Sequence, residues 1–274
     1  MKKIEKIESL YNSGTAKHFE DGHFVNLPFI GVVDGYSAPY NHEENPPILF
    51  NGVTGGQMVR NIILATFCSA TPDLSLETLA LKANKEIKER QKSARDLAGA
   101  SFLLAKVTEN TIEMLQGGDC YALWVKKSGE INITKNQWHK YDAALVKNFA
   151  QLMKEFNSDR KKAWKAHFPF LAKIKSENTN KVCANLNGQP EVEQCWQKIE
   201  IPLSDLSLLI YFTDGLVPFS AMEDENRLAE TVLTFFRVGG LRNLLAWTRL
   251  VEKKEATYSH EDHAEATGSA IKFI

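Results

Sequence analysis

Aspartates recur in this chain at one structural position, directly after an apolar run and beside a glycine. The three runs and their acids are PFIGVV with Asp34-Gly35, IEMLQ with Gly118-Asp119, and LLIYFT with Asp214-Gly215. The pair Glu20-Asp21 stands just before the first run. Mg²⁺ and Mn²⁺ prefer oxygen ligands, and a few carboxylates commonly hold them while several waters stay bound. If the runs are strands, these acids predict a divalent-metal site at one rim of a sheet.

A glycine beside each acid lets the backbone turn sharply and bring a carbonyl oxygen close to an ion. Asp-Gly is also a common tight turn, so any one of these dipeptides is more often a hairpin than a ligand. Three such acids together with Glu20-Asp21 favour the metal site.

The elements that position these acids are predicted to be short buried strands and amphipathic helices. Apolar runs predict strands at Pro28 to Val33, Ser101 to Val107, Ile112 to Gln116, Tyr121 to Lys126, Leu206 to Phe212 and Gly268 to Ile274. Apolar spacing predicts helices at Gly55 to Phe67 (with Thr54 as its cap), Ser75 to Arg90, Asp142 to Phe156, Asn226 to Arg237 and Leu241 to Val251.

Strands with short connections are interrupted by pairs of helices, which indicates an α+β protein in which two packed sheets are covered by helices. We therefore predict one domain over residues 1–274. The basic and aromatic stretch at about 157–190 is interpreted as an inserted flap, and nucleic-acid binding is a weaker interpretation because no partner motif accompanies it.

The bulk composition argues against several classes of protein. The 33 basic and 34 acidic side chains of the 274 residues nearly cancel, so no global charge favours nucleic acid or a membrane as partner. No apolar run approaches the roughly 20 residues that span a bilayer. The four cysteines lack zinc spacing and are expected to be free or buried thiols. We expect a cytoplasmic protein, and a monomer.

The acidic motifs, taken in order, resemble those of the metal-dependent serine/threonine protein phosphatases of type 2C, the PPM family. The matching segments are Glu20-Asp21, Gly31 to Gly35 for the GxxDG motif, Gly118-Asp119 for the GDS segment, Thr213 to Gly215 for the SDG motif, and Glu265 to Thr267 for the closing Asp-x-x-Thr. The resemblance covers nearly the whole chain. It implies a four-layer α/β/β/α sandwich of two antiparallel sheets flanked by helical pairs.

The resemblance also implies a ligand set and a reaction. Two Mn²⁺ or Mg²⁺ ions would be bridged by Asp34, with the Gly35 carbonyl and Asp214 in the first shell, Glu20 and Asp21 on bound waters, and Asp119 on a looser third ion. A water bridging the two ions would then attack the phosphorus of phosphoserine or phosphothreonine in a phosphoprotein.

The chain departs from the family pattern at three positions. Ala264 stands where the family supplies a metal-binding aspartate, so Asp262 or Glu265 reaches in, or one metal is weakened, or a natural aspartate has been replaced. Tyr36 replaces a histidine proposed as the general acid, and a tyrosine with its ordinary pKa of about 10 is a weaker acid. Lys17 is the nearest cation to a missing phosphate-binding arginine. His260 and His263, beside Asp262, are interpreted as surface side chains.

The main prediction is therefore a metal-dependent phosphoprotein phosphatase. The first alternative is a binding or regulatory module that keeps the fold and has lost catalysis, as Ala264 and Tyr36 suggest. A two-metal phosphodiesterase or nuclease ranks last because the order of the motifs argues against it.

Overall fold

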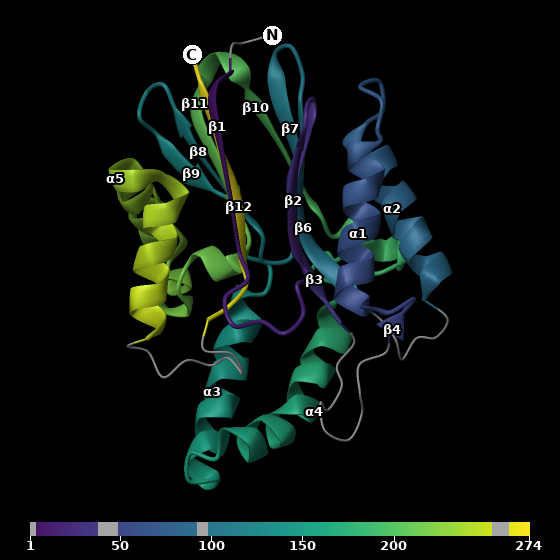
Figure 1. Cartoon of the computed structure of the whole chain (residues 1–274), viewed down its shortest axis with the longest axis vertical. Coiled ribbons are helices and arrows are strands. Elements are labelled where there is room, and N and C mark those ends of the chain that lie inside the picture. The colour runs from purple at the N-terminus through teal and green to yellow at the C-terminus, as the bar shows by residue number, and fades with distance from the viewer. Residues whose placement is uncertain (1–3, 38–48, 92–97, 254–262) are drawn as a thin grey trace.

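The computed structural model describes residues 4–37, 49–91, 98–253 and 263–274. Two five-stranded antiparallel sheets pack face to face (Figure 1). The first has the order β1-β12-β11-β8-β9 and the second the order β10-β7-β6-β3-β2. Their strands are β1 (Ile4–Asn12), β2 (Asp21–Asn26), β3 (Phe29–Tyr36), β6 (Gly99–Val107), β7 (Thr111–Gly117), β8 (Tyr121–Lys126), β9 (Ile131–Ile133), β10 (Gln197–Pro202), β11 (Leu206–Phe212) and β12 (Ala266–Phe273), beside a small hairpin of β4 (Leu49–Phe50) and β5 (Val53–Thr54).

The inner strands form because their side chains are apolar on both faces. One face of each sheet meets the other sheet, where Val32 and Leu103 pack in one cluster with Leu209 and Ile271. The opposite face meets helices, so an alternating polar pattern is absent from these strands. The six apolar runs correspond to β3, β6, β7, β8, β11 and β12, and the predicted strands are confirmed.

The outer layers are helical. Helices α1 (Gly55–Cys68) and α2 (Leu76–Arg90) cover the second sheet, and α5 (Glu225–Glu252) covers the first (Figure 1). Thr54 caps α1, as predicted, and forms a capping box with Gln57. One face of α1 buries Val59, Ile63 and Phe67 against the sheet, and each such side chain contributes roughly 1.5–3 kcal/mol. The predicted α+β sandwich of four layers is confirmed.

Helix α5 is bent at Gly239 and Gly240, where two helices were predicted. Gly240 has a φ of +70°, and a Cβ there would collide with the carboxylate of Glu8. That carboxylate accepts a hydrogen bond of 2.7 Å from the N–H of Leu241, the first residue of the second segment. The break therefore places an acid on the new helix start, where the exposed N–H groups favour negative charge.

Helices α3 (His139–Glu155) and α4 (Arg160–Asn178) form a hairpin that projects from one end of the sandwich (Figure 1). The predicted flap at 157–190 contains α4 and the segment that returns to the body, where Ala100 and Leu186 form a β-bridge. Its boundaries, like those of the single domain, stay a prediction. Short 3-10 turns complete the fold: η2 (Pro190–Gln194), η3 (Leu203–Asp205), η4 (Asp214–Leu216) and η5 (Phe219–Glu223).

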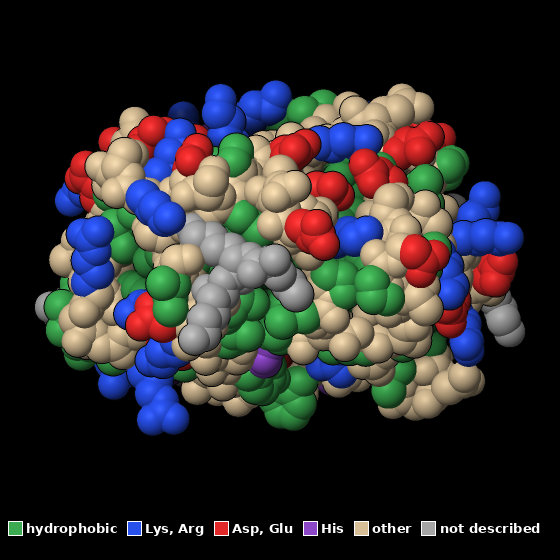
Figure 2. Space-filling view, turned by 90° about the horizontal axis from the view of Figure 1, so that it is seen from above, with side chains coloured by type: hydrophobic (Ala, Val, Ile, Leu, Met, Phe, Trp, Pro, Cys, Tyr) green, Lys and Arg blue, Asp and Glu red, His purple; other side chains and the backbone are tan. Residues whose placement is uncertain are grey.

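The opposite end of the sandwich, where β1 begins and β12 ends, mixes Lys and Arg with Asp and Glu across its surface (Figure 2). All four cysteines are free thiols, as expected. Within the described ranges, none of the helices combines the length and the apolar character needed to cross a membrane.

Candidate metal centre

The strand registers gather the predicted acids at the end of the sandwich from which α3 and α4 project. Asp21 opens β2 and pairs across the ladder with Asp34 of β3. Asp119 lies in the turn between β7 and β8, and Asp214 follows β11 directly. Glu265 immediately precedes β12, the neighbour of β11. Five acids that are distant in sequence therefore meet because antiparallel strands begin and end together at this rim.

Asp34 lies at the centre of this group. Its carboxyl group is hydrogen-bonded to the carboxyl groups of Asp21 and Asp214. Asp21 is also held by Thr213, whose hydroxyl donates to Oδ2 at 2.7 Å. Because Thr213 is in addition tied to the backbone of Thr267 by hydrogen bonds of 2.9 and 3.0 Å, strands β11 and β12 fix where this carboxylate stands.

Burial and mutual repulsion keep protons on the central acids. Burial raises the pKa of Asp34 well above its usual range, and the charges of Asp21 and Asp214 raise it further. Burial and then the charge of Glu265 do the same for the pKa of Asp21. The pKa of Asp214 is raised to about 7 by burial and by the charge of Asp119. A divalent cation would relieve this repulsion, because opposite charge favours the ionised carboxylate.

Glu265 is the acid that reaches into the group from the closing segment. Its Oε1 accepts a hydrogen bond from the hydroxyl of Tyr11 at 2.7 Å, and its Oε2 accepts one from the backbone N–H of Glu20 at 2.8 Å. It supplies the largest charge effect on Asp21. Of the candidates for the place of the missing ligand at Ala264, the structure brings Glu265 to the site, and Asp262 lies outside the described residues.

The carboxylate of Glu20 is engaged at the start of α1. Its Oε1 accepts hydrogen bonds from the hydroxyls of Ser37 and Thr54. Gly56 packs so closely on this carboxylate that a Cβ would overlap it, and Gly35 packs equally closely on the Glu20 carbonyl. The backbone N–H of Glu20 is therefore hydrogen-bonded to Glu265, a member of the acidic cluster. The side chain of Glu20 is hydrogen-bonded instead to Thr54, the cap of α1.

Helices α3 and α4 contribute two residues that were not predicted from the sequence. Burial and the charge of Asp119 raise the pKa of Asp142, in the first turn of α3, to about 7. Lys175 of α4 opposes both effects, because its positive charge lowers the pKa of Asp142 and that of Asp214. Its ammonium lies 3.7 Å from the centre of the buried Trp138 ring. In the sequence, only the basic and aromatic character of residues 157–190 pointed to Lys175, and no motif indicates Asp142.

Two predicted catalytic residues differ in their placement. The hydroxyl of Tyr36 packs against Gly99, and burial, followed by the charges of Asp119 and Asp34, raises the pKa of Tyr36, so the phenol stays protonated. Lys17 is exposed in the segment between β1 and β2. His263 is not a plain surface residue, since its ring is 23% exposed and its Nδ1 lies 2.9 Å from Glu252.

The five clustered acids have the type of ligand atom that hard divalent cations prefer. All five are carboxylates, and one oxygen of Asp119 is buried without a hydrogen-bond partner among the described residues. In the part of the chain that the structure describes, no three or more His, Cys, Asp or Glu side chains are already arranged around one ion position. The central carboxyl groups contact one another instead, and cation binding would have to replace protons in those contacts.

Comparison with known proteins agrees with this architecture. No protein-family model matches the chain, and no curated protein matches it. Solved structures of PPM serine/threonine phosphatases match it over nearly its full length, and the chain has their fold.

Three of these structures illustrate the likeness. The catalytic domain of PstP in complex with two manganese ions is 12% identical, with a TM-score of 0.59 and 99% of each chain covered. Mycobacterium tuberculosis PstP/Ppp is 14% identical, with a TM-score of 0.59 and 98% and 99% covered. Mycobacterium smegmatis MsPP in complex with cacodylate is 14% identical, with a TM-score of 0.56 and 99% of each chain covered. At this identity the likeness supports the fold, and the chemistry depends on the residues of this chain.

Proposed function

We propose that this protein is a metal-dependent serine/threonine protein phosphatase. The observation that carries the proposal is the gathering of Asp21, Asp34, Asp119, Asp214 and Glu265 at one end of a PPM-type sandwich. Packing these acids together has a cost in free energy, because burial and neighbouring negative charge raise the pKa values of Asp21, Asp34 and Asp214. A cation site that holds a phosphoryl group explains why such a cluster exists.

In this proposal Asp34, Asp214 and the carbonyl of Gly35 would hold two Mn²⁺ or Mg²⁺ ions, and Glu265 would take the place of the acid missing at Ala264. When bound, the ions supply a hydroxide nucleophile at neutral pH and positive charge for the phosphoryl oxygens. Asp34 and Asp214 must lose their protons first, so the affinity for metal should rise with pH.

The remaining roles concern ions and substrate. Glu20 and Asp21 are proposed to hold waters of the ions, and Asp119 a looser third ion. Tyr36 would donate a hydrogen bond to the leaving serine or threonine oxygen. Its raised pKa keeps the hydroxyl protonated for this role, but the same raised pKa makes Tyr36 a weak acid. Lys17 would meet the phosphate as a point charge. The role of metal ligand predicted for Asp262 depends on the sequence alone.

Cytoplasmic location, a monomeric state and the lack of a nucleic-acid or membrane partner also stay predictions. The near-neutral composition of the chain supports only the last of these.

Hydrolysis of p-nitrophenyl phosphate and of a phosphothreonine peptide, with Mn²⁺ or Mg²⁺ titrated in, tests the proposal. We expect metal-dependent turnover that Asp34→Asn abolishes and that the exposed control Asp205→Asn leaves intact. Ala264→Asp should lower the Mn²⁺ concentration needed for half-maximal activity. No turnover by the wild type or by Ala264→Asp at high metal would rule out the enzyme and favour a phosphatase-like binding module.

A further inference from the structure

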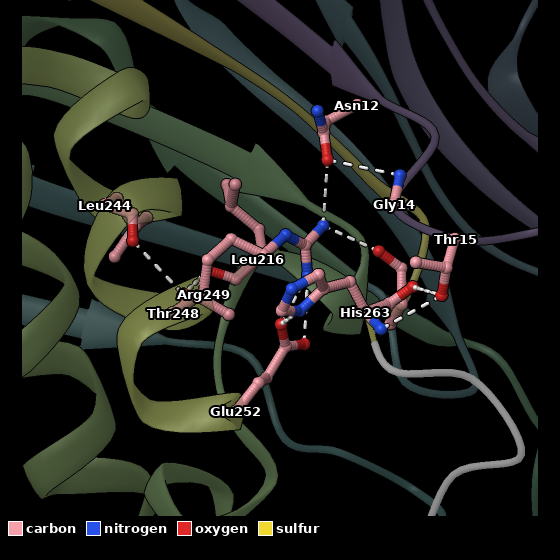
Figure 3. Close-up of polar contacts among 10 residues, drawn as sticks. Asn12, Gly14, Thr15, Leu216, Leu244, Thr248, Arg249, Glu252 and His263 are labelled. Carbon is pink, nitrogen blue, oxygen red and sulfur yellow. Dashed lines mark hydrogen bonds and ion pairs between the residues drawn. The ribbon is translucent and has the colours of Figure 1, made fainter. Parts of the chain in front are cut away.

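A cluster of polar side chains at the C-terminal end of α5 contacts His263, in the segment that precedes β12 (Figure 3). We call this cluster, made of Thr248, Arg249 and Glu252, the α5 clamp. Arg249 forms an ion pair with Glu252, in which Nη1 donates to both carboxylate oxygens at 2.8 and 2.9 Å. The two side chains are only 14% and 9% exposed. Burying such a pair is unfavourable unless its remaining donors also find partners.

The remaining arm of Arg249 is directed at the segment before β12. Its Nη2 donates to the carbonyl of Ala264 at 2.6 Å and to Oδ1 of Asn12 at 3.1 Å. Glu252 meets the ring of His263 at 2.9 Å, and the backbone of His263 exchanges hydrogen bonds with Thr15. The guanidinium therefore joins α5, the end of β1 and the residue adjacent to Glu265.

The same helical turn also fixes the segment that carries Asp214. The hydroxyl of Thr248 is fully buried and donates to the carbonyl of Leu216 at 2.8 Å (Figure 3). Leu216 ends the 3-10 turn that Asp214 opens. One turn of α5 thus contacts the backbone behind two of the proposed metal ligands.

The segment held by Arg249 is also closely packed against two glycines. Gly215 packs on the carbonyl of Glu265 so tightly that a Cβ would overlap the oxygen. On its other side, Gly14, with a φ of +55°, packs on the carbonyls of His263 and Ala264. The backbone beside Glu265 is thus contacted from three sides, and its carboxylate accepts hydrogen bonds from Tyr11 and from the N–H of Glu20.

We propose that Arg249 is a positioning residue for the metal centre, which orients Glu265 by holding the carbonyl of Ala264. The proposal rests on the proposed metal-binding function. Glu265 occupies the position after the missing aspartate, so its carboxylate must be directed to the ions by contacts from outside the metal centre. Arg249 supplies the one side-chain cation hydrogen-bonded to that backbone in the described part of the chain.

Calorimetric titration of Mn²⁺ into metal-free protein tests this without any turnover. Arg249→Gln should weaken Mn²⁺ binding about tenfold or more, because residues that orient metal ligands commonly affect affinity by 10–100-fold. Arg242→Gln is the matched control, since Arg242 is exposed on the same helix. It should leave the affinity unchanged. Loss of thermal stability in Arg249→Gln with unchanged Mn²⁺ affinity would overturn the proposal and leave a purely structural clamp.

A double-mutant cycle with Glu265→Gln decides whether Arg249 acts through Glu265. In the Glu265→Gln background, Arg249→Gln should cause little further loss of Mn²⁺ affinity, because coupled residues are not additive. Additive losses would refute the positioning role. If the wild type binds Mn²⁺ but hydrolyses no phosphoester, the proposed phosphatase function fails and the cycle still decides the role of Arg249. If the wild type binds no Mn²⁺, both proposals fail.

Discussion

Removing divalent metal should make the stability of this protein fall as the pH rises from about 5 to 8. In the metal-free protein the pKa of Asp214 is raised to about 7, and burial and neighbouring charge also raise the pKa values of Asp21 and Asp34. A group whose pKa is higher in the folded than in the unfolded state stabilises the fold fully at pH values below its unfolded pKa. That contribution is lost as the pH rises through the folded value.

The size of the effect follows from Asp214. A rise from 3.8 to about 7 is about three pH units, and at roughly 1.4 kcal/mol per unit the whole effect is at most about 4 kcal/mol in the free energy of unfolding. About two of these units lie above pH 5, so between pH 5 and 8 the expected loss from Asp214 is about 3 kcal/mol. Asp21 and Asp34 act in the same direction, but the three groups share protons, so their effects do not add. Against a total stability of about 5–15 kcal/mol, the loss is readily measured.

Urea denaturation of protein stripped with EDTA, at intervals between pH 5 and 8, measures this loss. We expect Asp214→Asn to flatten the profile and saturating Mn²⁺ to restore stability most strongly at the highest pH. Asp205→Asn, on the exposed turn η3, should change neither. A metal-free protein that is as stable at pH 8 as at pH 5, with no response to Asp214→Asn, would refute the view that these acids are protonated neighbours.

Two other substitutions test the surroundings of the acids. Gly215→Ala should lower the free energy of unfolding by about 1–3 kcal/mol, since the added methyl would overlap the Glu265 carbonyl; a change below 0.5 kcal/mol in urea denaturation would show that the segment before β12 can yield. Lys175→Gln should shift the metal-free stability loss to higher pH, because the positive charge that lowers the pKa of Asp142 and Asp214 is removed. Lys173→Gln, an exposed neighbour paired with Glu177, should leave the pH profile in place and serves as its control.

The sequence predicted the inner strands and missed the outer ones for one physical reason. The six predicted strands are the inner members of the two sheets, and the four missed ones, β1, β2, β9 and β10, are their edges. Edge strands meet solvent and carry charged side chains, as the sequence IEKIESLYN of β1 shows. Such strands lack the continuous apolar run that identifies a buried strand, so only the pairing itself reveals them.

The acids were predictable to the extent that strand ends carried them. Asp34, Asp119 and Asp214 follow apolar runs, and antiparallel pairing brings such ends to one rim. Asp142 and Lys175 could not be predicted in this way, because they reach the site through the packing of α3 and α4 on that rim. The cation–π contact of Lys175 with Trp138 joins α4 to the residue that precedes α3, and no sequence period relates the two.

Glu265 shows most clearly where sequence reasoning needs the tertiary structure. Within a strand, a one-residue offset from position 264 would turn the side chain to the opposite face. Residues 263–265 precede β12 and are not part of the ladder, so no strand alternation decides where an acid at position 265 points. Hydrogen bonds from Tyr11 and Glu20, and the hold of Arg249 on the preceding carbonyl, make that choice. The proposed replacement of the missing aspartate by Glu265 depends on these contacts. This is why Arg249→Gln and Glu265→Gln should both weaken metal binding, and why their effects should not add.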